Sequence, residues 1–394
     1  FPYTTLFRSK TVQKLMRFNL YTEDVDARAI FITGNFNGWK PKDLSYELQR
    51  TDANNFYIDV EDEILPEKIE YKYTKGGWEN VELDKFGSIT PNRKTTKKRK
   101  EINDTVDKWR LNWGPFKEEF FPIVEVISEK FYIPQLDRYR KVWALLPYDY
   151  YTSEKTYPVL YLQDAQNLFN ENSEFGNWEI DKKLSLLAEY GRGDLIVIAV
   201  EHGSEDRIKE YIFDNDSVAK GSEGKKYIRF IADTLKPYVD LNFRTKRDRE
   251  NTGIGGSSLG GLISIYSGFL YPEVYSKLMI FSPSLWVEPQ NNFPLLSFRN
   301  PYNIKIYLYG GELEGSRMVK RIRVFENNLQ KWEYKKLFNF EFKTNINPEG
   351  THNEFYWSQE FPKAVEWLFY NNEGNPAEVA PQLQSEDLNY EAND

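Results

Sequence analysis

A glycine-rich stretch with a serine at its centre is the segment of this sequence best suited to chemistry. Residues 253–261 read Gly-Ile-Gly-Gly-Ser-Ser-Leu-Gly-Gly, which places the pattern Gly-x-Ser-x-Gly around Ser258. This spacing is typical of a sharp turn from a strand into a helix, because glycines let the neighbouring backbone pass without a Cβ clash. The turn would expose the Ser258 hydroxyl at a helix N-terminus, where the N–H of Leu259 can stabilise developing negative charge. The pattern therefore predicts a serine nucleophile.

The residues on either side of this stretch agree with that prediction. Residues 251–254 form a short candidate strand, and the apolar run 259–270 has the length of a helix and stops just before Pro272. A strand, a turn and a helix in this order are the context that the serine pattern needs. The alternative interpretation is a glycine-rich turn that leads into a buried helix and has no catalytic role.

A serine nucleophile needs a base, and the chain has only two histidines, His202 and His352. In a serine hydrolase of this arrangement the histidine follows both the serine and the acid along the chain. His352 lies in a polar loop after residues 337–342, which alternate in polarity like a strand. We therefore expect His352 to be the base. His202 follows the apolar run 195–200 and is interpreted as a wall of the site or a structural residue.

The acid should follow another strand between the serine and the histidine. Residues 304–309 read as that strand and lead into Gly-Gly-Glu-Leu-Glu-Gly, which contains Glu312 and Glu314. Either carboxylate could orient His352 and stabilise its charged form. The residues themselves do not choose between the two.

These motifs and several others, in the same order along the chain, resemble the esterase D and enterochelin-esterase-like branch of the α/β-hydrolases. The resemblance runs from about residue 125 to 370. The segments that carry it are Tyr161–Phe169, Arg207–Tyr211, Leu235–Asp240, Gly256–Gly261 and Phe281–Trp286. It implies an α/β-hydrolase fold and a carboxylic ester hydrolase that needs no cofactor.

The resemblance also assigns roles to further residues. In that family the acid typically comes three residues after the glycine that ends its strand, which favours Glu314 over Glu312. The turn after residues 161–163 usually supplies the second N–H for the oxyanion, which points to Ala165 or Gln166, although alanine stands here where the family has glycine.

The substrate pocket is expected to draw on five residues. They are Asp164, Trp178, His202, Arg207 and Trp286. Trp178 corresponds to a position that lines the entrance, and Trp286 could form a wall of the acyl or alcohol pocket. Core packing is the alternative for both tryptophans. Arg207 could bind an anionic substrate, pair with a carboxylate of the site, or form an ordinary salt bridge.

The first part of the chain has the pattern of a separate all-β unit. Residues 11–110 contain several short alternating segments separated by turns, which predict a β-sandwich. Four motifs there resemble the starch-binding carbohydrate modules, whose tryptophans stack on glucose rings. The matching residues are Trp39, Lys72, Trp78 and Asn92. The alternative is a structural or oligomerising domain.

The predicted domain organisation follows from these patterns. We expect a non-native or disordered leader over 1–10, the sandwich over 11–110, and a linker over 111–122. Residues 123–370 alternate strands and helices around apolar runs, which predicts a mainly parallel α/β sheet with its site at the carboxyl ends of the strands. The acidic residues 371–394 are expected to be a disordered tail.

Composition excludes several classes of function. A net charge of −8 gives no overall basic field for nucleic acid or anionic membranes, and the basic run 93–100 is interpreted as a solvated strand. No apolar run reaches the length of a membrane span. With no cysteine and two distant histidines, we expect no metal site. Cytoplasmic and periplasmic locations both fit, and the sequence sets no oligomeric state.

The predicted function is hydrolysis of a small-molecule carboxylic ester through an acyl-enzyme on Ser258. The ester could be carbohydrate-linked or of the siderophore type, and an α-glucan is a candidate partner for the first domain. The alternatives are acyl transfer to a sugar hydroxyl, a glycan-binding protein with an inactive hydrolase domain, and a structural scaffold.

Overall fold

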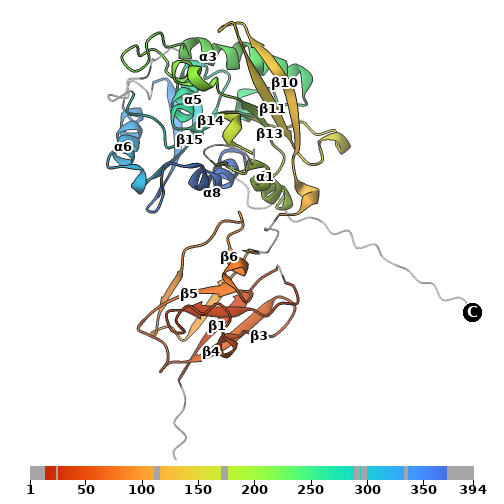
Figure 1. The fold of residues 1–394 in the computed structure, drawn as a ribbon, viewed down its shortest axis with the longest axis vertical. Coiled ribbons are helices and arrows are strands. Elements are labelled where there is room, and N and C mark those ends of the chain that lie inside the picture. The colour runs from red at the N-terminus through yellow and green to blue at the C-terminus, as the bar shows by residue number, and fades with distance from the viewer. Residues whose placement is uncertain are drawn as a thin grey trace, which may run out of the picture.

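The structure is a computed structural model with a β-rich N-terminal region and a larger α/β region (Figure 1). It describes residues 14–23, 25–110, 116–169, 176–287, 293, 300–331 and 336–370. The predicted leader and tail lie outside the described residues, as do residues 111–115 of the predicted linker.

The N-terminal region is built from short strands around one apolar core. The strands are β1 (Leu15–Tyr21), β2 (Phe31–Gly34), β3 (Gln49–Arg50), β4 (Asn55–Glu61), β5 (Lys68–Thr74), β6 (Glu82–Leu83), β7 (Arg93–Thr96), β8 (Glu101–Thr105) and β9 (Lys108–Trp109). They form sheets of order β3-β4-β1-β8, β2-β5-β7 and β6-β9. Alternate side chains of β1, namely Met16, Phe18 and Leu20, point into the core and are almost fully buried. This is the all-β unit that the sequence predicts.

The α/β region is organised around an eight-stranded sheet of order β10-β11-β13-β12-β14-β15-β16-β17. Its strands are β10 (Ile123–Ile133), β11 (Arg138–Leu146), β12 (Val159–Gln163), β13 (Ile196–Val200), β14 (Thr252–Ser257), β15 (Lys277–Phe281), β16 (Tyr302–Gly311) and β17 (Phe338–Asn347). The pairs from β13 to β17 are parallel, whereas β11 runs antiparallel to both of its neighbours. The expected α/β fold class is thus confirmed.

Strand β11 lies inside the sheet, between β10 and β13, and pairs with both. Val142, Ala144 and Leu145 on β11 are fully buried, as expected for a strand that is covered on both sides.

Helices cover both faces of this sheet. They are α1 (Ile180–Glu189), α2 (Arg207–Tyr211), α3 (Gly224–Phe230), α4 (Lys236–Asn242), α5 (Leu259–Leu270), α6 (Met318–Leu329) and α8 (Glu354–Val365). Successive side chains of a strand point to opposite faces. Tyr161 on β12 therefore joins the core under α2 to α6, whereas Leu160 and Leu162 join the core under α1 and α8.

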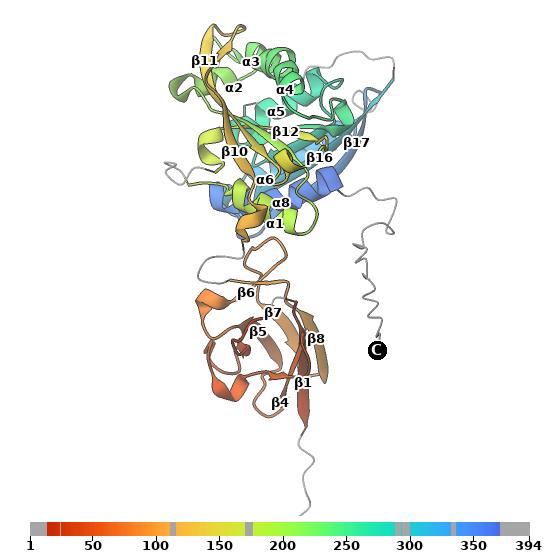
Figure 2. The same cartoon turned by 90° about the vertical axis from the view of Figure 1, so that its right-hand side faces the viewer.

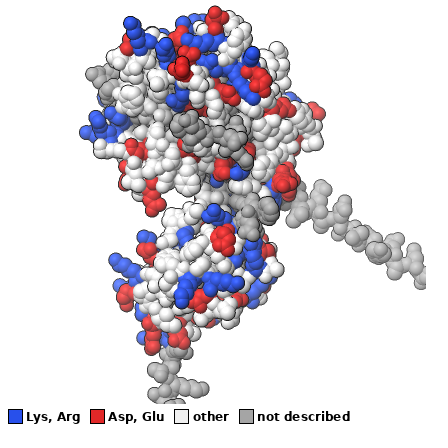
Figure 3. Space-filling view, viewed as in Figure 1, with Lys and Arg blue, Asp and Glu red and all other residues white. Residues whose placement is uncertain are grey.

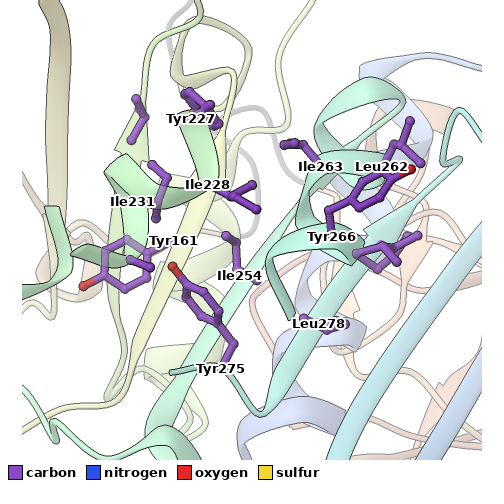
Figure 4. Packing of buried hydrophobic residues seen from close by; sticks show 14 of the residues in the cluster. Tyr161, Tyr227, Ile228, Ile231, Ile254, Leu262, Ile263, Tyr266, Tyr275 and Leu278 are labelled. Carbon is purple, nitrogen blue, oxygen red and sulfur yellow. The ribbon is translucent and has the colours of Figure 1, made fainter. Parts of the chain in front are cut away.

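The core on the first face holds the helix that follows Ser258. Figure 4 shows side chains of α3 and of the turn after it, such as Ile228, facing Ile254 on β14 and Ile263 on α5. Leu262 and Ile263 are fully buried, so α5 is fixed against the sheet by its own apolar residues. The first turn of α5 is thereby held at the end of β14.

The two regions contact each other on the side of α1 and α8 (Figures 1 and 2). Lys85 pairs with Glu366 at 2.7 Å, and Lys108 Nζ donates to Glu189 at 2.6 Å. Phe86 is buried in the same apolar cluster as residues of α1 and α8. The N-terminal region therefore packs against the α/β region through both charged and apolar contacts. Among the described helices, none is long and apolar enough to cross a membrane.

Candidate active site

Ser258 sits at the sharp turn between β14 and α5, with φ 55° and ψ −120°. A positive φ is strained for a residue with a Cβ and persists only where the surroundings enforce it. The positions around Ser258 require glycine because there is no room for a Cβ atom. A Cβ on Gly256 would lie 2.9 Å from the carbonyl carbon of Gly260, and one on Gly260 would lie 3.0 Å from a carboxylate oxygen of Asp164. Gly256 and Gly260 thus allow neighbouring backbone and side-chain atoms to approach closely.

The Ser258 backbone and hydroxyl are held by the segment after β15. The Ser258 N–H donates to the carbonyl of Phe281 at 3.0 Å, and the Ser284 N–H donates to the carbonyl of Ser258 at 3.0 Å. The two hydroxyl oxygens, Ser258 Oγ and Ser284 Oγ, are 3.2 Å apart. Leu259 is the first residue of α5, so its N–H is one of the four that lack a partner within the helix.

His352 and Glu314 form a hydrogen-bonded pair across the loops after β17 and β16. His352 Nδ1 lies 2.8 Å from Glu314 Oε2. The Glu314 side chain is fully buried, whereas that of His352 is 41% exposed. A carboxylate beside Nδ1 favours the tautomer that carries its proton there, which leaves Nε2 as the acceptor. The imidazole is therefore oriented for proton transfer at Nε2.

Glu314 is itself held by two donors. Its Oε1 accepts from the hydroxyl of Ser282 at 2.7 Å and from the N–H of Gly311 at 2.6 Å. Ser282 is fully buried at φ 44°, and its hydroxyl also accepts from Nε1 of Trp357 at 2.9 Å. The Trp357 ring stands edge-on to His352 at 5.0 Å between ring centroids.

The sequence does not predict that Ser282 and Trp357 support this pair. Ser282 lies within residues 281–286, which resemble the esterase family, and that resemblance could have pointed to it. Trp357 could not have been found in this way, because a tryptophan on a helix is most often a core residue.

A close approach of two loops brings the glutamate and the histidine together. A Cβ on Gly311 would lie 2.1 Å from the carbonyl oxygen of Gly350, and the N–H of Leu313 donates to the same oxygen at 3.0 Å. The adjacent Glu312 is exposed. Of the two glutamates that the residues alone left open, Glu314 is the one that contacts His352.

A cleft of about 350 Å³ opens over this group of residues. Ser258, His352 and Trp286 line it, together with Arg317 and Arg321 at the start of α6. Trp286 is 47% exposed and so offers an aromatic surface to whatever enters. The predicted serine, base and acid all border the same space.

Asp164 and Arg207 form a partly buried ion pair next to the start of α5. Arg207 donates from Nε and from one terminal nitrogen to the two carboxylate oxygens, at 2.7 and 2.9 Å. Burial works to lower the pKa of Arg207, but Asp164 outweighs it and the pKa is raised. Of the roles proposed for Arg207, the structure places it in a pair with a carboxylate of the site.

The turn after β12 carries Ala165 and Gln166, the candidates for the second oxyanion N–H. The Gln166 side chain exchanges two hydrogen bonds with the backbone of His202, at 3.0 and 3.1 Å. His202 Nδ1 accepts from the N–H of Ser204 at 3.0 Å, and burial lowers the pKa of His202. His202 is thus a neutral residue that braces the turn.

The predicted pocket position of Trp178 needs correction. Trp178 is only 2% exposed and stacks on Phe281 at 5.2 Å between ring centroids. It therefore belongs to the core beneath the site, because its flat ring fills the space under the end of β15.

The candidate glycan residues of the N-terminal region are only partly brought together. The rings of Trp39 and Trp78 lie 6.4 Å apart, and Trp78 is 41% exposed. Asn92 is exposed. Lys72, by contrast, is buried, and burial lowers its pKa. Its Nζ donates to the hydroxyl and carbonyl oxygens of Thr90, so the prediction that it contacts a glycan needs correction.

The described residues contain no group of three His, Asp or Glu side chains that could hold a metal ion.

Comparison with known proteins places the α/β region in a family. A family model described as "Putative esterase" matches residues 133–368. The uncharacterized protein YbbA of Bacillus subtilis (strain 168) is 25% identical over 246 residues, which is 59% of this chain and 94% of that protein. An amylopullulanase of Thermoanaerobacterium thermosulfurigenes is 34% identical over 103 residues, which is 24% of this chain but 5% of that protein.

A solved structure shares the fold over most of the chain. The enterobactin esterase FES from Shigella flexneri superposes with a TM-score of 0.50 at 11% identity, covering 88% of this chain and 90% of that one. The family match itself spans more than half of the chain and includes Ser258, Glu314 and His352. The chain therefore belongs to this esterase family and is a carboxylic ester hydrolase with an α/β-hydrolase fold.

Proposed function

We propose that this protein hydrolyses its ester through an acyl-enzyme on Ser258. The observation that carries the proposal is the His352–Glu314 pair, 2.8 Å between its atoms, on the same cleft as a serine at a strained turn. A nucleophile, a base and an acid that orients the base are the parts that acyl transfer requires.

The reaction proceeds in two halves. Ser258 Oγ attacks the ester carbonyl while His352 Nε2 takes its proton, and the C–O bond to the alcohol then breaks as His352 returns that proton to the leaving oxygen. Water attacks the acyl-enzyme with the same assistance, which releases the acid and restores Ser258. Glu314 stabilises the imidazolium that forms in each half.

The oxyanion is stabilised by backbone N–H groups. The N–H of Leu259 is available at the first turn of α5, where the helix dipole also favours negative charge. The turn that holds Ala165 and Gln166 follows β12, a direct neighbour of β14, and supplies the second donor. The Asp164–Arg207 pair and His202 brace that turn.

The test is the release of p-nitrophenol from acetyl and butyryl esters. We expect Ser258→Ala and His352→Ala each to lower kcat/KM by at least about 10³-fold, because the members of such a group act as a unit. Circular dichroism and the melting temperature of each variant establish that it is folded. Unchanged activity in Ser258→Ala would contradict the proposal, as would wild type that neither hydrolyses esters nor reacts with a fluorophosphonate at Ser258.

The same assay separates hydrolysis from the alternatives. Acyl transfer to a sugar would show as an ester product when a sugar is added at high concentration, with less free acid per p-nitrophenol released. A folded protein that neither turns over esters nor reacts with the fluorophosphonate would support a binding role.

The N-terminal region has a second candidate function, which is to bind an α-glucan. The observation that favours it is the pair of neighbouring rings, Trp39 and Trp78. Flat aromatic faces suit the apolar face of a pyranose ring. A carbohydrate-linked ester would then be brought close to the hydrolase region.

A further inference from the structure

Two arginines at the start of α6 border the cleft that contains Ser258. Arg317 and Arg321 are separated by one helical turn, so they lie on the same side of the helix. Both line the cleft together with Ser258 and His352. Figure 3 shows Lys and Arg side chains gathered over α6 at the left edge of the α/β region.

The charges of these two arginines are not neutralised within the described part of the chain. Neither side chain forms an ion pair or a side-chain hydrogen bond there, whereas Arg207 is bound by Asp164 and Arg323 by Glu326. Among the described residues that line the cleft, the one carboxylate belongs to Glu314, and it is already hydrogen-bonded at both oxygens.

Two guanidinium groups this close together destabilise each other. Like charges one helical turn apart repel each other. Burial and, after it, the charge of Arg317 both lower the pKa of Arg321. A negatively charged group between the two guanidinium groups would remove this repulsion and would accept several charge-assisted hydrogen bonds.

We propose that Arg317 and Arg321 bind a negatively charged group on the ester that Ser258 hydrolyses, so that the preferred substrates are anionic esters. The inference rests on the proposed function of Ser258 and specifies its substrate class. The Asp164–Arg207 pair could not serve this purpose, because its charges cancel. A carboxylate and a phosphate share the oxygen geometry that a guanidinium recognises.

Hydrolysis of matched pairs of esters tests this and shows which part of the substrate carries the charge. For the acid part, the pair is the mono-p-nitrophenyl ester of adipic acid and p-nitrophenyl hexanoate. For the alcohol part, the pair is p-carboxyphenyl acetate and p-carbamoylphenyl acetate. The enzymes are wild type, Arg317→Gln, Arg321→Gln and, as a control, Lys320→Gln, which removes a charge from the same helix at a residue that does not line the cleft.

We expect wild type to have a higher kcat/KM for the charged member of at least one pair. Each arginine variant should reduce that preference about ten-fold while the neutral member keeps its rate, and Lys320→Gln should retain the preference. Added NaCl should weaken the preference, because salt screens exposed charges. Equal losses on charged and neutral esters in the arginine variants would overturn the proposal, as would equal rates on both members of each pair in wild type.

A binding measurement separates this proposal from the proposed catalysis. Calorimetric titration of wild type and Arg321→Gln with adipate monoamide and with neutral adipamide needs no turnover. Tighter binding of the charged ligand that is lost in Arg321→Gln would support the anion site even if no ester were hydrolysed. Ester hydrolysis without any such difference in either assay would overturn the anion site and leave the catalytic proposal standing.

Discussion

The cleft around Ser258 differs from the aromatic surface of the N-terminal region, formed by Trp39 and Trp78, in where the polar side chains point. In the cleft, the buried Glu314 is held by three hydrogen bonds and directs His352 toward the open space. In the N-terminal region, the ammonium of Lys72 is turned inward to Thr90, and the ring of Trp78 is exposed beside the partly buried ring of Trp39.

The difference shows how each surface could work. A reaction site needs charged groups fixed at defined positions, since small displacements weaken transition-state stabilisation. A surface that binds sugars by stacking needs mainly flat rings that stay accessible. Substitutions in the first region should therefore change kcat, whereas those in the second should change only binding.

The largest effect is expected for Glu314→Gln, which removes the negative charge beside His352. We expect kcat on p-nitrophenyl butyrate to fall by about 10³- to 10⁴-fold, because the imidazolium loses its counter-charge and the tautomer is no longer set. Glu312→Gln is the matched control and should retain wild-type kcat. Equal activity of the two variants would remove Glu314 from the mechanism.

Insertion of a methyl group at Gly311 should separate Glu314 from His352. The new Cβ of Gly311→Ala would meet the carbonyl oxygen of Gly350 at 2.1 Å, so the loop before His352 must move. We expect a loss of about 1–3 kcal/mol in unfolding free energy and a fall in kcat of folded enzyme. Gly268→Ala, which meets Leu278 at 2.5 Å, should lower stability but retain kcat. Full kcat in Gly311→Ala would show that the two loops do not need this contact.

Ser282→Ala tests whether the hydrogen bond from Ser282 to Glu314 contributes to activity. Loss of the Ser282 hydroxyl removes one donor to Glu314 and the acceptor for Trp357 Nε1, so we expect kcat to fall about ten-fold with little change in KM. Ser282 acts as a positioning residue, and the pH profile of kcat/KM should shift because the environment of His352 changes. A fall in melting temperature with an unaltered kcat and profile would instead indicate a structural role alone.

For the aromatic surface, Trp78→Ala should weaken binding to insoluble starch by about two- to ten-fold, the contribution expected for one aromatic contact. Its kcat on p-nitrophenyl butyrate should stay at the wild-type value. Leu44→Ala, at a residue that is 76% exposed in the same region, is the control for surface hydrophobicity. Starch binding that is absent in wild type, or equal in both variants, would contradict the glycan proposal.

The smallest effect concerns Glu354, next to the loop that carries His352. Burial, and more weakly Asp164, raises the pKa of Glu354, so the folded protein favours its protonated form. The ionised carboxylate therefore destabilises the fold at neutral pH. Glu354→Gln should raise the unfolding free energy at neutral pH, with a gain that disappears as the pH falls below the ordinary pKa of a glutamate. A gain that persists at low pH would contradict this account.

The sequence reveals the elements of the α/β region because its strands are continuous apolar runs and its serine turn has a strict glycine requirement. Helix α5 has the bounds expected from residues 259–270. The positions of side chains off these patterns could not be predicted. Trp178 looks the same in sequence whether it lines a pocket or stacks on Phe281, and only the three-dimensional path of the chain shows that Lys72 faces Thr90.

The choice between Glu312 and Glu314 shows the same limit of local patterns. Glu312 and Glu314 lie on the same short turn after β16. They differ only in the direction in which the turn points each side chain. That direction depends on Ser282 and Gly311, which donate to Glu314 from a neighbouring strand end and from the turn itself. Contacts between segments that are distant in sequence therefore determine which glutamate reaches His352, and the local sequence pattern does not.

The segment 281–284 links two parts of the site that are far apart in sequence. It binds the Ser258 backbone through Phe281 and Ser284, and it binds Glu314 through Ser282. Substitutions at the turn around Ser258 and at Glu314 should accordingly be non-additive in double-mutant cycles. For enzyme engineering, residues 281–284 should therefore be left unchanged, because they support both parts of the site. Arg317 and Arg321 at the start of α6 are instead positions where substitutions could change which esters are accepted.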